Sequence, residues 1–257
     1  MTIKEYYETK CSDYQKGAEK VRQAIDWLKS DDDKLNEKKK FWIGQIEHRI
    51  KTFDSFCKKC LKKGLIKSID DKNVDTDKIE SEIRDIAGVR VICVYIDLLE
   101  DVMEAIRRVP GVEVKRTKNY IESPELKPNG YRAIHLELSV QVPDIIRGTI
   151  SVLVEVQIRT YLQHVWSVAE HAILYKPGSE MPEVIKLVLG DFFVELGKKF
   201  VRIDASMVVA RERAATNRKD FDPFAYLTKK LTKKVPELKT LAKEELDDIT
   251  SVLRLAA

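Results

Sequence analysis

The sequence predicts an α+β fold in which a central mixed β-sheet of about five strands is flanked by N- and C-terminal helices. Apolar residues recur at helical spacing near both ends of the chain, whereas β-branched runs of strand length lie between them. Strands in the middle and helices at the ends are typical of a sheet that helices cover. The length of 257 residues fits one domain, or a core domain with a smaller helical annex.

Helical spacing dominates the N-terminal part of the chain. Ala18 and Val21 lie on one face of a helix expected over residues 14–30, and a second helix is expected over residues 35–48. A third, basic segment has apolar residues at helical spacing and a stop signal at Gly64. We therefore expect roughly the first seventy residues to be all-helical.

The pattern changes at Asp85. Residues 88–96 form a β-branched run, and its nearly continuous apolar character predicts a strand buried on both faces. A loop around Pro143 is expected to separate the last two strands. The other expected elements are a helix over residues 98–108, strands over 112–116, 133–140 and 149–158, and helices over 161–175 and 182–213.

Composition excludes several classes of protein. Apolar residues make up 44% and charged residues 34% of the chain, and no apolar stretch is long enough to span a bilayer. The N-terminus lacks the apolar run of a signal peptide and the four cysteines are too scattered for a disulfide scaffold, so we expect a cytoplasmic protein. Cys57 and Cys60 form a lone C-x-x-C pair, and a zinc site would need a second pair of ligands.

The net charge of +4 is too small to indicate a nucleic-acid-binding protein by itself. Positive charge gathers in the tail beyond Arg213, which is either a solvated helix surface or an appended helical element that grips an anionic partner. The basic pairs of this tail are Arg218-Lys219, Lys229-Lys230 and Lys233-Lys234.

Two carboxylates stand out because each lies on or beside a strand that is expected to be buried. Asp85 opens the first of these strands, and Glu155 lies within the last. A charge there is costly unless it is paired with cations or coordinates a metal. Two acids on neighbouring strands suit one Mg²⁺, which takes a couple of carboxylates and completes its octahedron with phosphate oxygens and water. The alternative is a pair of buried salt bridges, such as Asp85 with Arg84 or Arg90.

Cations at element edges, or within strands that share a sheet face with the acids, favour a phosphate-binding site. A set of mixed sign can hold a polyphosphate and its metal, because arginine forks engage two phosphate oxygens at once. Scattered solvated side chains are the alternative. The sequence contains no P-loop or dinucleotide-binding glycine loop. The cations are Arg49, Lys51, Lys59, Arg90, Arg116, Lys118, Lys127, Arg132 and Arg159.

An aromatic ring stands just before the strand expected over residues 133–140. Gly130, Tyr131 and Arg132 follow a turn-rich stretch with Pro128. The ring of Tyr131 either packs into the core or offers its face to a nucleobase, and core packing is the simpler expectation for the ring taken alone.

Four segments follow one another between Arg49 and Lys176, about half of the chain. They are Lys51-(x)₃-Ser55, Arg84 to Val91, Tyr120-Ile121 followed by Asn129 to His135, and Val154 to Thr160 followed by Trp166-(x)₃-Glu170-His171. In order and nearly in spacing they resemble the signatures of the RelA/SpoT alarmone synthetase domain, and a small alarmone synthetase in particular.

The resemblance implies a GTP pyrophosphokinase with a nucleotidyltransferase-like fold. The β,γ-diphosphate of ATP would pass to the ribose 3′-hydroxyl of GDP or GTP, giving AMP and the alarmones ppGpp or pppGpp of the stringent response. By this resemblance Asp85 and Glu155 hold Mg²⁺, and Glu155 also accepts the proton of the 3′-hydroxyl.

The resemblance also assigns residues to the two nucleotides. Arg49 and Arg90 would sandwich the adenine of ATP, and its phosphates would lie along Lys51, Ser55 and Lys59. For the acceptor nucleotide, Tyr131 would stack on guanine, Lys118 and Arg132 would meet phosphates, and His135, Gln157 and His164 would line the pocket.

We expect three consecutive regions along the chain. They are an N-terminal helical region with the donor-phosphate segment over residues 1–84, the synthetase core sheet over residues 85–176 and a C-terminal helical region over residues 177–257. No His-Asp pair of the alarmone hydrolase type precedes Arg49, so we expect a synthetase-only member. The resemblance further implies a homo-oligomer assembled through terminal helices, which the helices after Pro182 could supply.

The acceptor half of the resemblance is less complete than the donor half. Asn119 stands where bifunctional members carry Asp, Ala133 stands where serine is common, and the stretch between Ile121 and Gly130 is longer. Two alternatives therefore stay open. The same site could pyrophosphorylate tRNA 3′ ends or adenine nucleotides, as in toxins restrained by an antitoxin, or the chain could be an inactive RNA- or partner-binding protein.

Overall fold

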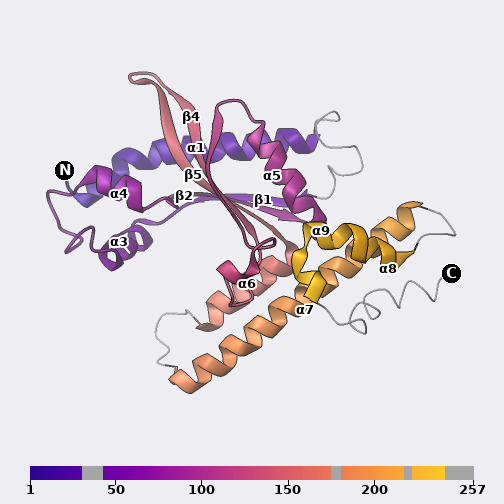
Figure 1. Cartoon of the computed structure of the whole chain (residues 1–257). Coiled ribbons are helices and arrows are strands. Elements are labelled where there is room, and N and C mark those ends of the chain that lie inside the picture. The colour runs from indigo at the N-terminus through magenta and orange to yellow at the C-terminus, as the bar shows by residue number, and fades with distance from the viewer. Residues whose placement is uncertain (31–42, 175–180, 217–221, 241–257) are drawn as a thin grey trace. The chain divides into compact units, whose positions relative to one another are not determined.

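A computed structural model describes residues 1–30, 43–174, 181–216 and 222–240. Its five-stranded sheet has the order β1-β2-β5-β4-β3, with helices before and after it in the chain (Figure 1), as the sequence predicts. The strands are β1 (Ile43–Ile50), β2 (Ala87–Cys93), β3 (Val112–Asn119), β4 (Ile134–Asp144) and β5 (Gly148–Thr160). The helices of seven or more residues are α1 (Ile3–Ser30), α3 (Phe53–Lys62), α4 (Thr76–Glu82), α5 (Leu99–Arg107), α6 (Tyr161–Leu174) and α7 (Glu183–Thr216).

The chain folds as two compact units. The first contains Met1–Val91, Met103–Thr117 and His135–Gln157, and the second contains Ile92–Val102, Lys118–Ile134 and the chain from Ile158 onward. Most residues of the sheet therefore belong to the first unit, together with α1, α3 and α4. The expected division into three consecutive regions stays a prediction.

Helix α1 runs along the sheet strands of the first unit (Figure 1). The prediction of a helix over residues 14–30 is confirmed, and the helix begins earlier, at Ile3. Its apolar face is buried, and a Cβ added at Gly17 would lie 3.1 Å from side-chain atoms of both Val152 and Val154. The close approach of α1 covers the face of β5 opposite to Glu155, because alternate residues of a strand point to opposite faces.

The helix predicted over residues 35–48 is wrong where the structure describes it. Residues 43–48 lie in β1, and residues 35–42 fall outside the described ranges. The three isoleucines of β1 lie three and four residues apart, which is helical spacing, and only Ile43 is fully buried. As an edge strand paired with β2, β1 is held extended by backbone hydrogen bonds, so its side chains need not alternate in polarity.

The other predicted elements are confirmed with shifted ends. Strand β2 ends at Cys93 because a 3₁₀ turn begins at Ile96, and β3, β4 and β5 each extend beyond the predicted strands. Gly64 follows α3 with a φ of 66°, as its predicted role as a stop requires. The prediction of a loop around Pro143 is wrong, because Pro143 belongs to β4 and the turn follows Asp144.

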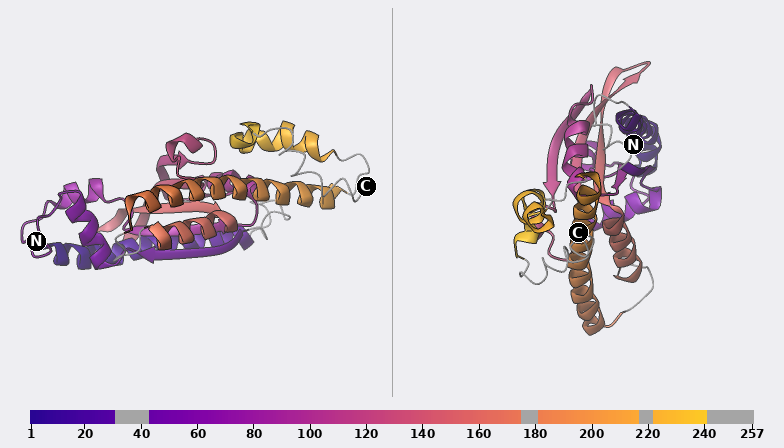
Figure 2. Two further views of the ribbon diagram at one scale, coloured as in Figure 1. Left: turned by 90° about the horizontal axis from the view of Figure 1, so that it is seen from below. Right: turned by 90° about the vertical axis from the view of Figure 1, so that its right-hand side faces the viewer.

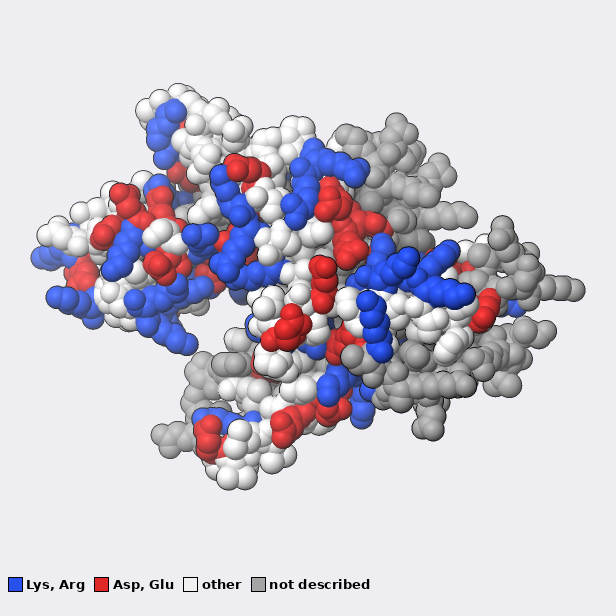
Figure 3. Space-filling model, viewed as in Figure 1, with Lys and Arg blue, Asp and Glu red and all other residues white. Residues whose placement is uncertain are grey.

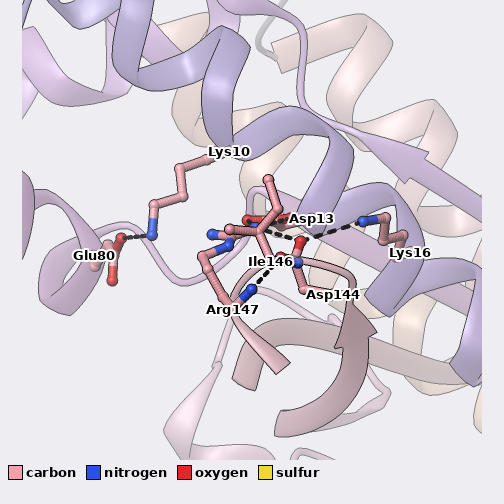
Figure 4. Close-up of polar contacts among 7 residues, drawn as sticks. All are labelled: Lys10, Asp13, Lys16, Glu80, Asp144, Ile146 and Arg147. Carbon is pink, nitrogen blue, oxygen red and sulfur yellow. Dashed lines mark hydrogen bonds and ion pairs between the residues drawn. The ribbon is translucent and has the colours of Figure 1, made fainter. Parts of the chain in front are cut away.

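The turn between β4 and β5 is tied to α1 by charged groups (Figure 4). Arg147 donates hydrogen bonds to both carboxylate oxygens of Asp13, at 2.8 and 2.9 Å, and to Asp144 at 2.9 Å. Lys16 lies 3.7 Å from Asp144, which also accepts the backbone N–H groups of Ile146 and Arg147. Because Asp13 is buried, its charge needs these partners. The contacts fasten the hairpin that carries Glu155 to α1.

Helices α6 and α7 of the second unit lie side by side (Figure 2). Trp166 of α6 is buried, and its indole N–H donates to the carbonyl of Phe193 in α7 at 2.8 Å. Tyr131 and Ala133 complete this hydrophobic cluster, in which three of the four buried side chains are aromatic. The two helices confirm the predictions over residues 161–174 and 182–213, while residue 175 lies outside the described ranges.

Part of the basic tail folds into short helical turns. Leu227, Leu231 and Val235 are buried, whereas Lys229 and Lys230 are exposed to solvent. The pair Arg218-Lys219 lies outside the described residues. Figure 3 shows positive and negative side chains interleaved on the visible face. None of the described helices is both long and apolar enough to cross a membrane.

Candidate active site

Asp85 and Glu155 line one cavity in the first unit. The cavity has a volume of about 290 Å³, and both acids reach it from different parts of the sequence, Asp85 just before β2 and Glu155 from β5. The sheet therefore brings together two acids that are seventy residues apart in the chain. The full lining is Glu47, His48, Arg49, Asp85, Gly88, Val89, Arg90, Glu155 and Gln157.

Asp85 is turned toward the cavity by its buried neighbours in the link between α4 and β2. Its neighbour Ile86 is buried, and adjacent residues of an extended segment point to opposite sides, so Asp85 points away from the core. Its carboxylate pairs with two lysines, Lys59 at 2.8 Å and Lys51 at 3.2 Å. These pairs differ from the arginine salt bridges that the sequence left open for Asp85.

The arginines on either side of Asp85 have other partners. Arg84 donates to Glu137 at 2.9 Å, and Arg90 donates to Glu47 at 3.0 Å. Arg90 and Arg49 both line the cavity, so the structure brings the two arginines predicted for adenine to the same space as the acids. Their contact with adenine stays a prediction.

Helix α3 positions Lys59 and Ser55. Thr52 caps the helix, because its side-chain oxygen accepts the backbone N–H of Ser55 and its hydroxyl donates to the Ser55 hydroxyl at 2.9 Å. Phe56 and Cys60 are buried beneath the helix, and Lys59 lies on the face near Asp85. Burial also raises the pKa of the Cys60 thiol to about 11.

Glu155 owes its orientation to strand alternation. Val154 and Val156 are buried on the α1 side, so Glu155 and Gln157 share the other face of β5. The Gln157 amide donates to Glu155 at 2.8 Å, and Nδ1 of His135 on β4 lies 3.2 Å from the other carboxylate oxygen. Residues predicted for the acceptor pocket thus hold the predicted base.

The charge of Glu155 is stabilised although the side chain is largely buried. Burial alone would raise the pKa of this carboxyl, but His135, Gln157 and the ammonium of Lys59 outweigh burial and lower the pKa from 4.5 to about 2. The carboxylate is therefore ionised at neutral pH. It can accept a proton or bind a cation, but it is a weak base.

The chemistry of these donors fits Mg²⁺. Among the described residues no three His, Cys, Asp or Glu side chains are grouped as a metal site. Mg²⁺ is usually held by one or two carboxylates together with substrate phosphates, rather than by an all-protein cage. Asp85 and Glu155, facing one cavity with Lys51 and Lys59 beside them, match that requirement, and the metal itself stays a prediction.

The remaining acceptor residues, Lys118, Tyr131, Arg132 and His164, belong to the second unit. Tyr131 is 7% exposed and packs against Tyr120 and Trp166, while the ammonium of Lys127 lies over its ring, 4.3 Å from the centroid. The structure thus has the core packing that the ring taken alone suggested. Stacking on guanine stays a prediction.

Arg132 is buried in an ion pair with the C-terminal segment. Its guanidinium donates to both carboxylate oxygens of Glu237, at 2.7 and 3.0 Å, and to the carbonyl of Tyr131 at 2.9 Å. Lys118 lies near the end of β3, and His164 is half-buried on α6. Phosphate binding by Arg132 and Lys118 stays a prediction, as does the place of His164 in an acceptor pocket.

Sequence reasoning missed several residues that line the cavity. The sequence predicts a helix at Glu47 and His48, and it assigns Gly88 and Val89 to a strand and to the motif from Arg84 to Val91 without a role of their own. Glu47 shares a strand face with Arg49, but the sequence does not show this, because the isoleucines of β1 have helical spacing. No signal in the sequence points to Glu237, which meets Arg132 across 105 residues of chain.

Comparison with known proteins identifies similar chains. The sequence model described as "Region found in RelA / SpoT proteins" matches residues 48–180. The chain is 34% identical over 141 residues to GTP pyrophosphokinase YwaC and 35% identical over 118 residues to GTP pyrophosphokinase YjbM, both of Bacillus subtilis. These matches cover 54% and 46% of this chain. They span 62% and 54% of the two relatives, which is less than two thirds of either.

Solved structures share the fold. The crystal structure of small alarmone synthetase 1 from Bacillus subtilis bound to its product pppGpp matches with a TM-score of 0.64 and 27% identity. This match covers 80% of this chain and 97% of that one. A GTP pyrophosphokinase family protein from Streptococcus pneumoniae matches with a TM-score of 0.66 at 23% identity, over 87% of this chain and all of that one.

Proposed function

The chain belongs to the RelA/SpoT family, and from this premise we propose that it is a GTP pyrophosphokinase. It transfers the β,γ-diphosphate of ATP to the 3′-hydroxyl of GDP or GTP and releases AMP. The observation that carries the proposal is the single cavity that Asp85 and Glu155 share with Arg49 and Arg90. An anionic substrate with a metal needs such a set of mixed charge.

The transfer makes and breaks defined bonds. The 3′-oxygen of the acceptor ribose attacks the β-phosphorus of ATP, and its bond to hydrogen breaks. The bond between the β-phosphorus and the α,β-bridging oxygen also breaks, and AMP leaves with that oxygen. Glu155 accepts the proton, and because its pKa is low, proton transfer must accompany phosphoryl transfer rather than precede it.

The neighbours of Glu155 keep the base in one orientation. His135 and Gln157 each hold one of its oxygens, so the carboxylate is fixed before the substrate arrives. Lys51 and Lys59 lie where they can pair with phosphate oxygens of the donor. Bound to Asp85 and Glu155, Mg²⁺ would supply positive charge that stabilises the transferring group.

The guanosine acceptor is supported by the relatives. Two of them are named GTP pyrophosphokinases, and one structural neighbour is described as bound to its product pppGpp. A second acceptor, the 3′ end of tRNA, is favoured by the exposed lysines Lys229, Lys230 and Lys233 of the second unit, which could bind a polyanion. An antitoxin would be needed if the acceptor is tRNA or an adenine nucleotide.

The test is a competition among acceptors. ATP labelled in its β- and γ-phosphates is offered with GDP, GTP, ATP and deacylated tRNA together, and Asp85→Ala serves as the inactive control. We expect label on the guanosine nucleotides. Label on tRNA alone would overturn the guanosine assignment, and salt-dependent RNA binding without any AMP would indicate an inactive binding protein.

We also propose a homo-oligomer. Apolar side chains on α6 and α7 remain exposed, among them Val168, Leu187 and Val188, and large exposed apolar patches mark interaction sites. Leu187→Asp should lower the mass measured by light scattering, whereas Lys186→Asp on the same helix should not. An unchanged mass for both variants would contradict this interface.

A cytoplasmic location agrees with the proposed substrates, because ATP and GTP are cytoplasmic nucleotides. All four cysteines are free thiols, as is usual in a reducing compartment. Fractionation of cells that express the chain tests this proposal, and recovery in the membrane or secreted fraction would contradict it.

A further inference from the structure

Two ammonium groups hold the carboxylate of Asp85 between them. Lys59 Nζ lies 2.8 Å from one of its oxygens, and Lys51 Nζ lies 3.2 Å from the other. The side chains of Asp85 and Lys51 are only 26% and 14% exposed. Water therefore screens these charges less than it would at an open surface.

Both lysines are held in place by the fold. The backbone N–H of Lys51 donates to the carbonyl of Ile86 at 2.8 Å, and its carbonyl accepts the hydroxyl of Tyr7 at 2.7 Å. Lys59 lies on α3, which is anchored by the buried side chains of Phe56 and Cys60. The backbone that carries each lysine is thus anchored beside Asp85.

The charge of Lys59 also reaches the second acid. Burial raises the pKa of Glu155, while His135, Gln157 and then Lys59 lower it. Lys59 is therefore the ion-pair partner of Asp85, and its positive charge also helps to keep Glu155 ionised.

A divalent cation that binds Asp85 must compete with these ammonium groups for the same oxygen lone pairs. It is also repelled by them, because like charges a few ångströms apart in a partly buried site are only weakly screened. A polyphosphate removes this obstacle, since its oxygens give both lysines new partners. Asp85 is then released for the cation that the polyphosphate brings.

We propose that Lys51 and Lys59 make metal binding at Asp85 conditional on a bound nucleoside triphosphate. The proposal rests on the proposed function, because it takes the cavity as the place where the donor nucleotide and its metal meet. Binding linkage then predicts that the lysines change the affinity for metal and the affinity for nucleotide in opposite directions. The lysines weaken the affinity for metal alone and strengthen the affinity for nucleotide alone.

The first measurement uses Mn²⁺ alone, titrated into the full chain at constant ionic strength and followed by electron paramagnetic resonance of the free ion. Lys59→Met should bind Mn²⁺ about 10-fold more tightly than the parent protein, given the usual size of such couplings. Lys58→Met is the matched control, because it removes the same charge from an exposed position on the same helix. It should leave the Mn²⁺ affinity unchanged.

The second measurement uses α,β-methylene ATP in the presence of EDTA, followed by calorimetry. Lys59→Met should bind the analogue about 10-fold more weakly, and Lys58→Met should bind it as the parent does. A residue with a merely structural role would lower both affinities or neither. Adding Asp85→Asn to Lys59→Met should abolish the gain in Mn²⁺ affinity.

Two outcomes would overturn the inference. In the first, Lys59→Met and Lys58→Met bind Mn²⁺ with equal affinity, or neither variant binds it. In the second, Lys59→Met binds Mn²⁺ more weakly than the parent protein. Failure of the proposed function looks different, because then the parent protein transfers no diphosphate from ATP and does not bind the ATP analogue. The Mn²⁺ titration would still report whether Lys59 competes with metal for Asp85.

Discussion

The two units use charged and aromatic residues in different ways. In the first unit, Asp85 and Glu155 face a cavity, and their partners are groups that a nucleotide could replace or use. In the second unit, Tyr131 is almost fully buried in a hydrophobic cluster, and Arg132 is almost fully buried in a bidentate ion pair. The same family motifs thus supply accessible chemistry in one unit and structural contacts in the other.

This difference predicts two classes of variants. Substitutions among the polar residues that line the cavity should remove activity in a protein that still folds, because these side chains lie outside the buried core. Substitutions around Tyr131 and Arg132 should destabilise the protein first. Any loss of acceptor binding can then be measured only in variants that remain folded.

Glu155→Gln should have the largest effect. Loss of the base should lower the rate of AMP formation by about 10³-fold, within the usual contribution of general-base catalysis. The melting temperature should fall, because the low pKa of Glu155 means that its charge stabilises the folded protein and the amide lacks that charge, but the variant should still fold. Initial rates and thermal melts of the same preparation test this, and a rate within tenfold of the parent would contradict the assignment.

Glu237→Ala should destabilise the protein by about 3–5 kcal/mol, because it leaves the Arg132 guanidinium buried without its counter-charge. Denaturant unfolding measures the change. Glu183→Ala, at an exposed position on α7, is the control and should have little effect. A fully stable Glu237→Ala variant would show that Arg132 does not depend on this pair.

Asp204 gives the second unit a pH-dependent stability. Burial raises its pKa to about 7 from 3.8, although the hydroxyl of Thr160 and the amide of Gln163 partly oppose this. The folded protein therefore binds a proton that the unfolded chain loses, so the free energy of unfolding falls as pH rises from about 4 to about 7.

Asp204→Asn should remove this dependence. Between pH 4.5 and pH 8, the free energy of unfolding of the variant should rise relative to that of the parent by on the order of 3 kcal/mol. Urea unfolding at the two pH values measures the difference. Parallel pH profiles of the parent and the variant would refute the role of this carboxyl.

Gly197→Ala tests the packing of α7 against the loop that carries Tyr131. A Cβ at Gly197 would lie 2.4 Å from the carbonyl oxygen of Gly130, so the loop or the helix must shift, at about 1–3 kcal/mol. Gly190→Ala on the same helix meets nothing within 4 Å and should stabilise the protein by about 0.5–1 kcal/mol. Equal stabilities would contradict this packing.

Much of the candidate site in the first unit could be predicted from the sequence. Asp85 and Glu155 are acids in apolar strand contexts, which is a signal that a single sequence carries, and the family match confirms the resemblance drawn from their motifs. The edge strand β1 could not be recognised in this way. Its isoleucines have helical spacing, and only pairing with β2 reveals a strand.

Contacts between residues far apart in the chain could not be predicted from the sequence. The ion pair between Arg132 and Glu237 depends on how the C-terminal segment folds back within its unit. No pattern in the sequence predicts that these two residues meet. Asp204 did leave a signal, because it lies between Val201 and Val208 on the apolar face of α7. A carboxylate in such a position is expected to be buried and to titrate abnormally.

The central claim is that Glu155 and Asp85 act together in the transfer of a diphosphate. It is tested most directly by ³¹P nuclear magnetic resonance of ATP, GDP and Mg²⁺ incubated with the parent protein and with Glu155→Gln. We expect AMP and a guanosine 3′-diphosphate in equal amounts with the parent, and neither with the variant. Formation of ADP with a 3′-monophosphate or orthophosphate, or equal product from both proteins, would contradict the claim.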